Sequence, residues 1–347
     1  MSALDTALNT IDAVAAEGDL AAERTTVDRL ELEPIGEPIV LPDGKQIYPP
    51  RLHGQPIDEL ACALLDMREP ADSTFLRLIG PPGAGKSQIA RAIAHRLWTG
   101  RGRSVESRHG VPFYGFVELQ PGPSSDEFFF RYDYVPLPGA GGQVTLVDSA
   151  FVEAMRAGWV VMIDEVNTAR DVCLLSINGT LDGRLALYLA ATGETVLAQP
   201  GFAVLLAYNP GLVGATDIPD AWHSRFPATL EVSSNWAALA ALGAPEALVG
   251  EAMRLDRQRI AGEDGLQWTP QFRDIEALWR MMQRIGERPA LAFFASNLHE
   301  QVQAGKLQDA EAAAASRMLD QAGYAHLKIS AASGRPSLHG YPRAVTG

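Results

Sequence analysis

The sequence has only two cysteines, Cys62 and Cys173, and they lie far apart with no CxxC pattern or histidine cluster beside either. A disulfide framework and a zinc site both need several such residues at characteristic spacings, so the sequence predicts neither. We therefore expect a protein of a reducing compartment, with the cytoplasm as the default location.

Long hydrophobic runs and an excess of positive charge are also missing. No apolar stretch reaches the roughly 20 residues that a membrane-spanning helix needs. A secretion signal has a basic segment followed by an apolar one, whereas the first residues of this sequence are acidic. No secretion signal is therefore expected. The net charge is −13, whereas nucleic-acid binding depends on Lys and Arg displacing counterions from phosphates. With 347 residues, 47% of them apolar, we expect a globular chain with one large domain and a smaller one.

A glycine-rich loop is the strongest pattern in the sequence. Residues 80–87 fit the motif G-x-x-x-x-G-K-[ST], with a predicted buried strand before them and a predicted amphipathic helix after them. In such a loop, backbone N–H groups and the helix N-terminus hold phosphates, Lys86 reaches the outer phosphates and Ser87 ligates Mg²⁺. The predicted nucleotide-binding residues here are Gly80, Pro81, Pro82, Gly83, Ala84, Gly85, Lys86, Ser87 and Gln88.

Two later apolar runs end in polar residues. The run over 158–163 is followed by Asp164 and Glu165, and the run over 202–208 by Asn209. Continuous apolar runs are typical of parallel strands covered on both faces, and open α/β sheets bind ligands at the carboxyl ends of such strands. Asp164 is therefore predicted to complete the Mg²⁺ shell, Glu165 to orient the attacking water, and Asn209 to bind the γ-phosphate or that water.

In this order the motifs resemble those of the AAA+ ATPases, and within them the MoxR-like and dynein/midasin-related group, with its CbbQ, NorQ, GvpN and cobaltochelatase small-subunit types. The resemblance covers about residues 60–278. It rests on the Walker A loop 80–87, the Walker B strand 160–165, a presensor-hairpin pattern over 181–202, Asn209-Pro210 as sensor 1, and Ser224-Arg225-Phe226 where the family usually has Asp-Arg-Phe.

The resemblance implies a P-loop NTPase fold, a three-layer αβα domain with a parallel sheet in the order 5-1-4-3-2, followed by an α-helical lid. It implies hydrolysis of ATP with Mg²⁺ in a ring, most commonly a homo-hexamer. In that ring Arg225 would reach the neighbour's nucleotide; the alternative is a surface charge. The resemblance further implies a chaperone that remodels or activates a protein client or metalloenzyme complex, often through a partner with a von Willebrand factor A domain.

Four positions depart from the family pattern or leave it open. Glu118 stands where many relatives have the Asn that restrains the catalytic glutamate. Arg273 is the candidate sensor 2 residue, with Thr269 predicted to cap its helix, and the alternative is an exposed helical arginine. Leu52 and His53 precede the first predicted helix, and they belong either to the adenine pocket or to a surface loop.

The predicted domains are an N-terminal extension and lead-in over 1–50, the ATPase domain over 51–234, the helical lid over 235–325 and a flexible tail over 326–347. A second hairpin is predicted within the long insert 120–147, which falls where MoxR-like proteins carry their helix-2 insert. Its aromatic residues Phe128–Phe130 and Tyr132 either grip a client or pack against the domain.

Two other functions stay open from the sequence alone. A nucleic-acid motor or nucleotide-dependent restriction subunit shares the hairpin insertions, but the net charge of −13 argues against it. A nucleotide-binding assembly factor with little turnover is the third possibility. DNA binding that falls steeply with salt would indicate the motor, and an ATPase assay separates the assembly factor from the ring ATPase.

Overall fold

The computed structural model describes residues 37–52, 54–65, 75–121, 128–136, 142–209, 218–226, 228–324, 327–328 and 337–338. These residues divide into two compact units. The first holds the residues up to Pro81 together with Lys86–Ser233, and the second holds Pro82–Gly85 and the residues from Ser234 onward. Within the described ranges, every helix is too short or too polar to cross a membrane.

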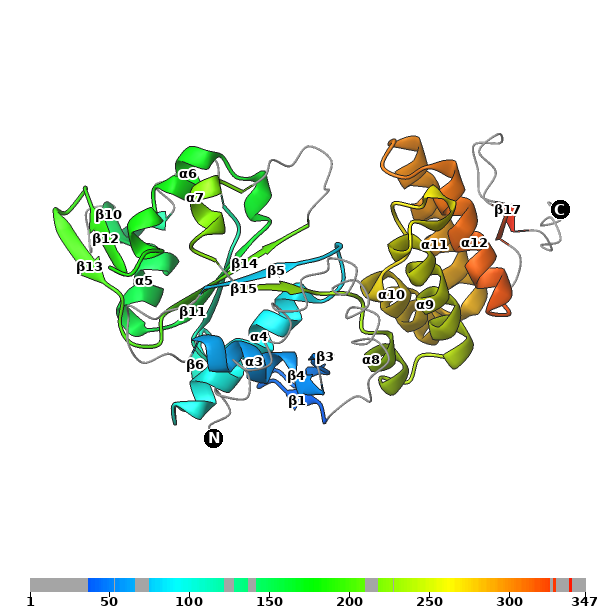
Figure 1. Cartoon of the computed structure of the whole chain (residues 1–347), viewed down its shortest axis with the longest axis horizontal. Coiled ribbons are helices and arrows are strands. Elements are labelled where there is room, and N and C mark those ends of the chain that lie inside the picture. Colours follow the sequence, from blue (N-terminus) through cyan, green and yellow to red (C-terminus); the bar gives the residue numbers. More distant parts are fainter. Residues whose placement is uncertain are drawn as a thin grey trace, which may run out of the picture. The chain divides into compact units, whose positions relative to one another are not determined.

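A five-stranded parallel sheet forms the centre of the first unit (Figure 1). Its order is β15-β5-β14-β11-β8, which is 5-1-4-3-2 when the strands are numbered along the chain, so the predicted fold is confirmed. The strands are β5 (Leu76–Ile79), β8 (Phe116–Leu119), β11 (Val160–Asp164), β14 (Ala203–Tyr208) and β15 (Ala228–Glu231). Strands β11 and β14 are buried on both faces up to their last residue, as their continuous apolar runs predicted.

The first unit contains the helices α3 (Ile57–Leu65), α4 (Lys86–Gly100), α5 (Ala150–Ala157), α6 (Asp171–Leu175) and α7 (Asp220–His223). Helix α4 contacts β8, β11 and β14, and α5 contacts β8 and β11. Helix α5 begins at Ser149, whose hydroxyl accepts the N–H of Val152, and ends at Gly158 in the left-handed conformation. A Cβ at Gly158 would lie 2.3 Å from the carbonyl oxygen of Pro200, so only glycine fits there.

Five antiparallel hairpins complete the described part of the first unit. Three are short: β1 (Ile39–Val40) with β2 (Gln46–Ile47), β3 (Arg51–Leu52) with β4 (Gln55–Pro56), and β6 (Glu106–Arg108) with β7 (Val111–Phe113). The other two are the predicted ones. The insert hairpin pairs β9 (Phe130–Pro136) with β10 (Gly142–Asp148), and the presensor hairpin pairs β12 (Ala186–Leu189) with β13 (Glu194–Leu197).

The aromatic residues of the insert divide between the two predicted roles. Phe128 is buried and packs edge-on against Phe151, with ring centroids 5.5 Å apart. Tyr132 and Tyr134 are instead 69% and 64% exposed. Phe128 therefore anchors the insert on α5, while the tyrosines of β9 face solvent.

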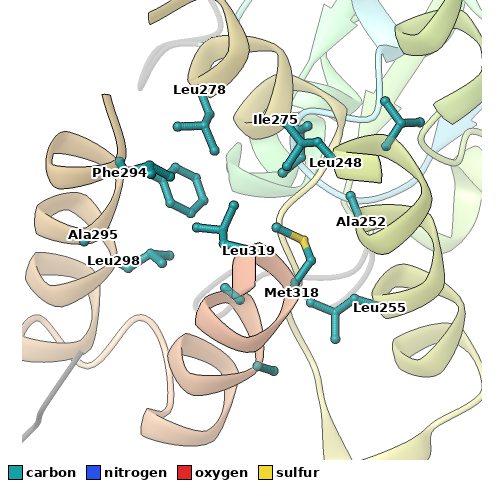
Figure 2. Packing of buried hydrophobic residues seen from close by; sticks show 14 of the residues in the cluster. Leu248, Ala252, Leu255, Ile275, Leu278, Phe294, Ala295, Leu298, Met318 and Leu319 are labelled. Atoms are coloured by element: carbon teal, nitrogen blue, oxygen red, sulfur yellow. The ribbon is translucent and has the colours of Figure 1, made fainter. Parts of the chain in front are cut away.

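The second unit is helical, as predicted for the lid. It consists of α8 (Trp236–Ala241), α9 (Glu246–Ile260), α10 (Phe272–Ile285), α11 (Glu287–Gln303), α12 (Asp309–Gln321) and a short pair, β16 (Leu327–Lys328) with β17 (Ser337–Leu338). Figure 2 shows its core, where Leu248, Ile275, Phe294, Met318 and Leu319 meet from four helices. Full burial of each such side chain stabilises the fold by about 1.5–3 kcal/mol.

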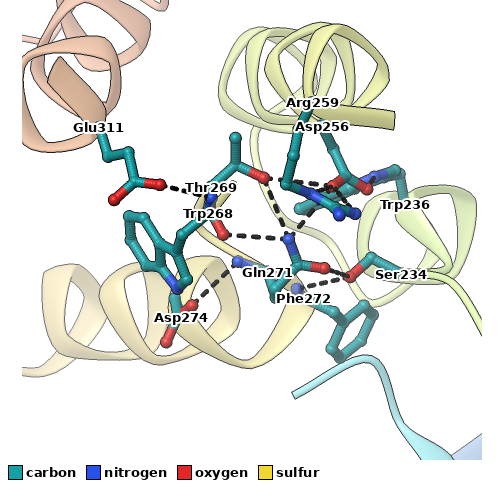
Figure 3. A network of polar contacts seen from close by, with 10 residues as sticks. All are labelled: Ser234, Trp236, Asp256, Arg259, Trp268, Thr269, Gln271, Phe272, Asp274 and Glu311. Carbon is teal, nitrogen blue, oxygen red and sulfur yellow. Dashed lines mark hydrogen bonds and ion pairs between the residues drawn. The ribbon is translucent and has the colours of Figure 1, made fainter. Parts of the chain in front are cut away.

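The start of α10 differs from the prediction. Its N-cap is Gln271 rather than Thr269, and a capping box joins Gln271 to Asp274. Thr269 is buried, and its hydroxyl donates to Asp256 Oδ1 at 3.2 Å (Figure 3). The reason is that the fully buried carboxylate of Asp256 needs hydrogen-bond donors, and Thr269 supplies one of them.

Asp256 is the centre of a polar network that joins three elements of this unit (Figure 3). It also accepts from Trp236 Nε1 of α8 at 3.3 Å, from Arg259 of α9 at 2.8 Å and from Gln271 Nε2 at 3.1 Å. The oxygen of the Gln271 amide in turn accepts the hydroxyl of Ser234 at 3.0 Å. The network fixes the first turn of α10, the helix that carries Arg273.

Candidate functional site

The glycine-rich loop connects β5 to α4 and is packed tightly at its first residue. Gly80 donates its N–H to the carbonyl of Tyr208 at 3.3 Å, and a Cβ at Gly80 would lie 2.0 Å from the carbonyl oxygen of Val232. Gly83 and Gly85 have φ of 83° and 102°. Residues with a side chain rarely adopt such angles, so the loop requires glycine at these positions.

Lys86 is the first residue of α4, and its side chain folds back onto the loop. The Nζ atom donates to the carbonyls of Gly80 at 2.8 Å and Pro81 at 3.0 Å. Ser87 follows in the first turn of the same helix. The positive charge of Lys86 therefore lies beside a helix N-terminus, where backbone N–H groups and the helix dipole also favour an anion.

Asp164 is the last residue of β11 and lies at the same edge of the sheet as the loop. Its register partner on β14 is Ala207, one residue before Tyr208. Burial raises the pKa of the Asp164 carboxyl above its ordinary value, and the nearby charge of Glu118 adds to the increase while Lys86 opposes it. Such a carboxyl is stabilised as an anion by a bound cation.

Glu165 has an unusual backbone conformation for a residue with a side chain. Its φ and ψ are 50° and 37°, in the left-handed region, which costs roughly 1–2 kcal/mol. The turn is held by Thr168, whose N–H and hydroxyl donate to the carbonyl of Glu165 at 2.9 and 2.8 Å. Strain of this kind gathers at functional sites, where the surrounding structure holds it in place.

Gln120 contacts the predicted catalytic carboxylate directly. Its Nε2 donates to Glu165 Oε2 at 2.6 Å, whereas Glu118 pairs with Arg91 of α4 at 3.5 Å. The family position considered in the sequence was Glu118, so Gln120 was missed. The available signal was its amide side chain immediately after the second strand of the sheet.

Asn209 follows β14, and its backbone is held by a second residue that sequence reasoning missed. Asn167 is 4% exposed and donates its Nδ2 to the carbonyl of Asn209 at 3.0 Å. The only sequence signal for Asn167 was a polar residue two positions after Glu165. The loop, Asp164, Glu165 and Asn209 thus lie at the carboxyl ends of β5, β11 and β14, which are neighbours in the sheet.

The remaining predicted residues of the first unit lie on other elements. Arg225 follows α7, and its Nη1 donates to the carbonyl of Ala221 at 2.5 Å. The hydrogen bond from Arg184 is the main cause that lowers the pKa of Asp182, and the charge of Arg225 adds to it. Leu52 is half-buried in β3, and His53 lies outside the described residues.

Arg273 is the second residue of α10 and belongs to the second unit, as does Gly83. A Cβ placed on Gly83 would lie 3.1 Å from the Cβ of Arg273. The backbone of Gly83 is therefore in contact with the start of α10, and a side chain at position 83 would press on Arg273. The role of Arg273 as a sensor residue stays a prediction.

Residues 76–226 match the model of the AAA domain, dynein-related subfamily. This stretch is similar to AAA domains. Within it lie the phosphate loop, Asp164, Glu165, Asn209 and Arg225, whereas Leu52, His53 and Arg273 lie outside the matched range.

Curated relatives are similar to part of the chain. An uncharacterised protein of Staphylococcus epidermidis is 30% identical over 153 residues, and one of Staphylococcus haemolyticus is 32% identical over 150 residues. Each match covers 43% of this chain and 52% of the relative, so the chain spans about half the length of the curated relatives it matches. A crystal structure of a protein of Cytophaga hutchinsonii has a TM-score of 0.36 at 15% identity, over 51% of this chain and 45% of that one.

Proposed function

We propose that the chain is a Mg²⁺-dependent, ring-forming ATPase of the MoxR-like type that remodels or activates a partner protein in the cytoplasm. The observation that carries the proposal is the meeting of three motifs at one edge of the sheet, within a stretch that is similar to AAA domains. The phosphate loop, the Asp164–Glu165 pair and Asn209 follow three neighbouring strands there.

The residues at this edge fit a nucleotide and a magnesium ion. Mg²⁺ prefers oxygen ligands and is usually held by one or two protein oxygens plus phosphates and water. The carboxylate of Asp164 and the hydroxyl of Ser87 supply such oxygens. In the described part of the chain no group of three or more His, Cys, Asp or Glu is placed to enclose a metal.

Each residue then has one task in hydrolysis. Lys86 and the N–H groups of the loop bind the outer phosphates, while bound Mg²⁺ neutralises their negative charge. Glu165 orients the water and accepts its proton, and the amide of Asn209 donates to the γ-phosphate or to the water. Gln120 holds the carboxylate of Glu165 at one of its two oxygens.

The ring supplies what one subunit lacks. We assign Arg225 to the nucleotide of a neighbouring subunit in a homo-hexamer, and Arg273 to the nucleotide of its own subunit, where its backbone adjoins Gly83. The client contact is assigned to one face of the insert hairpin. Tyr132, Tyr134 and Val144 share that face and are 69%, 64% and 62% exposed. A protein with a von Willebrand factor A domain is the partner that the family resemblance favours.

The test compares three variants in ATP binding and phosphate release. Lys86→Ala should lose tight ATP binding, because it removes the charge at the loop. Glu165→Gln should bind ATP as the wild type does and hydrolyse it about 10²–10⁴-fold more slowly, because only the proton acceptor is lost. Glu231→Gln is the matched control, an exposed acid at the end of β15, and should behave as the wild type. Wild-type hydrolysis by Glu165→Gln would contradict the assignment.

The same variants identify the client. Glu165→Gln with ATP should retain proteins that turnover normally releases, and Lys86→Ala should not retain them. Proteins found with the first variant and absent from the second are the client candidates. Salt-sensitive DNA binding in place of a protein client would indicate a nucleic-acid motor instead.

A further inference from the structure

Two consecutive carbonyl groups at the end of β14 accept hydrogen bonds from opposite sides. The carbonyl of Tyr208 accepts the N–H of Gly80 at 3.3 Å, and the carbonyl of Asn209 accepts Asn167 Nδ2 at 3.0 Å. Successive carbonyls of a strand point to opposite neighbours, and β14 lies between β5 and β11 in the sheet. One bond therefore ties the strand end to the phosphate loop and the other ties it to the turn after β11.

Asn167 itself is fixed by the turn that contains Glu165. It lies in the single 3-10 turn Val166–Thr168, which starts directly after Glu165 and is closed by Thr168. Val166 is fully buried and Asn167 is 4% exposed. Because Asn167 is buried and Asn209 is itself half-buried, water should not easily replace the lost Asn167 amide at the carbonyl of Asn209.

The direction of the Asn209 side chain depends on this bond. Asn209 precedes a proline in the sequence, which limits its backbone to the extended region. Within that region the bond from Asn167 fixes the Asn209 carbonyl, and with it the backbone from which the Asn209 side chain extends. We propose that Asn167 is a positioning residue that aims the Asn209 amide at the reacting phosphate and couples the Glu165 turn to the first glycine of the phosphate loop. This inference rests on the proposed ATPase function, and Asn167 acts without touching the nucleotide.

The kinetic test uses Asn167→Ala, Asn167→Asp and Asn209→Ala. Each Asn167 variant should lower kcat about tenfold with little change in KM, as expected for one lost hydrogen bond. The double variant Asn167→Ala/Asn209→Ala should be no slower than Asn209→Ala alone, because Asn167 acts through Asn209. Ser149→Ala is the matched control, since it removes buried hydrogen bonds at the start of α5, a helix assigned no contact with the nucleotide, and should keep the wild-type kcat.

A second measurement needs no turnover. Without nucleotide, the amide hydrogen of Gly80 should exchange about tenfold faster in both Asn167 variants, because the strand end that accepts it is released. The same amide should be unchanged in Ser149→Ala. Absence of ATP hydrolysis by the wild type would contradict the proposed function, while Gly80 exchange would still decide whether Asn167 couples the turn to the loop.

Three results would overturn the inference. The first is an unchanged exchange rate of the Gly80 amide. The second is a double variant whose decrease in kcat equals the product of the decreases in Asn167→Ala and Asn209→Ala. The third is loss of the folded state in both Asn167 variants. The last result would make Asn167 a residue of the fold alone.

Discussion

At the scale of single residues, the predicted catalytic carboxylate is restrained in both backbone and side chain. Glu165 adopts a left-handed backbone, which its turn stabilises through Thr168. Its Oε2 is engaged by Gln120 at 2.6 Å. A carboxylate oxygen that already accepts a hydrogen bond is less available to a water molecule. Gln120 should therefore limit hydrolysis by the resting subunit.

We expect Gln120→Ala to raise basal ATP turnover several-fold, since a single hydrogen bond of this kind is worth about 1 kcal/mol. ATP affinity should not change, because Gln120 is assigned no contact with the phosphates. Steady-state phosphate release and nucleotide binding measure the two effects. Gln143→Ala, at an exposed glutamine of β10, is the control. A decrease in turnover would show that Gln120 positions Glu165 for catalysis rather than restraining it.

At the scale of elements, Arg156 of α5 connects the two long hairpins of the first unit, which lie side by side in Figure 1. Its Nε contacts Asp148 at the end of β10 at 2.7 Å. Its two terminal nitrogens contact both carboxylate oxygens of Glu194 in β13 at 2.6 and 2.7 Å. Exposed ion pairs contribute little to global stability. Their local effect is to tie both hairpins to one helix, so that we expect them to move together.

Arg156→Gln should accelerate amide exchange in both β10 and the presensor hairpin, with little change in Tm. Asp148→Asn should also accelerate amide exchange in the presensor hairpin, although Asp148 belongs to the insert hairpin and reaches Glu194 only through Arg156. The hydrogen bond from Arg156 lowers the pKa of Glu194 below its ordinary value of 4.5. The ion pair between Arg156 and Glu194 is therefore present above pH 4.5 and is lost as the pH falls through the lowered pKa of Glu194. Arg280→Gln, which breaks an ion pair within α10, is the control. Unchanged exchange in Arg156→Gln would mean that the hairpins are held by packing alone.

At the scale of the whole molecule, the proposed catalyst is a ring of subunits. The guanidinium of Arg225 donates to Ala221 of its own chain and is half-buried. To act in trans, the guanidinium must leave that carbonyl and bind a phosphate of the nucleotide in the neighbouring subunit. Arginine fingers contribute roughly 10³–10⁵-fold to hydrolysis, so an isolated subunit should be a poor ATPase.

Arg225→Ala should bind ATP normally and hydrolyse it roughly 10³-fold more slowly. Mixing it with Glu165→Gln subunits should restore part of the activity, because some interfaces then combine an intact finger with an intact glutamate. Arg184→Ala is the control on a nearby exposed arginine. Confirmed mixed rings without recovery at any ratio would exclude action in trans, and a defect in Arg184→Ala alone would move the finger to that residue.

The family resemblance supplied the sheet order, and sequence patterns were sufficient for the two hairpins and the helical second unit. Long apolar runs such as 158–163 and 202–208 specify buried parallel strands by themselves, and the phosphate loop requires the strand and helix on either side of it. The cap of α10 was wrong, because Thr269 is bonded to a buried carboxylate 13 positions earlier in the chain. A local capping rule does not include such a partner.

What the sequence by itself determined is the set of groups at the candidate site: the loop glycines, Lys86, Asp164, Glu165 and Asn209. Their types and spacings follow from the chemistry of binding phosphate and activating water, which is local to each motif. Only the tertiary structure decided that Gln120 rather than Glu118 contacts Glu165, and that Asn167 holds Asn209. These pairs are 45 and 42 positions apart in the chain, and they meet because parallel strands bring distant strand ends to one edge of the sheet.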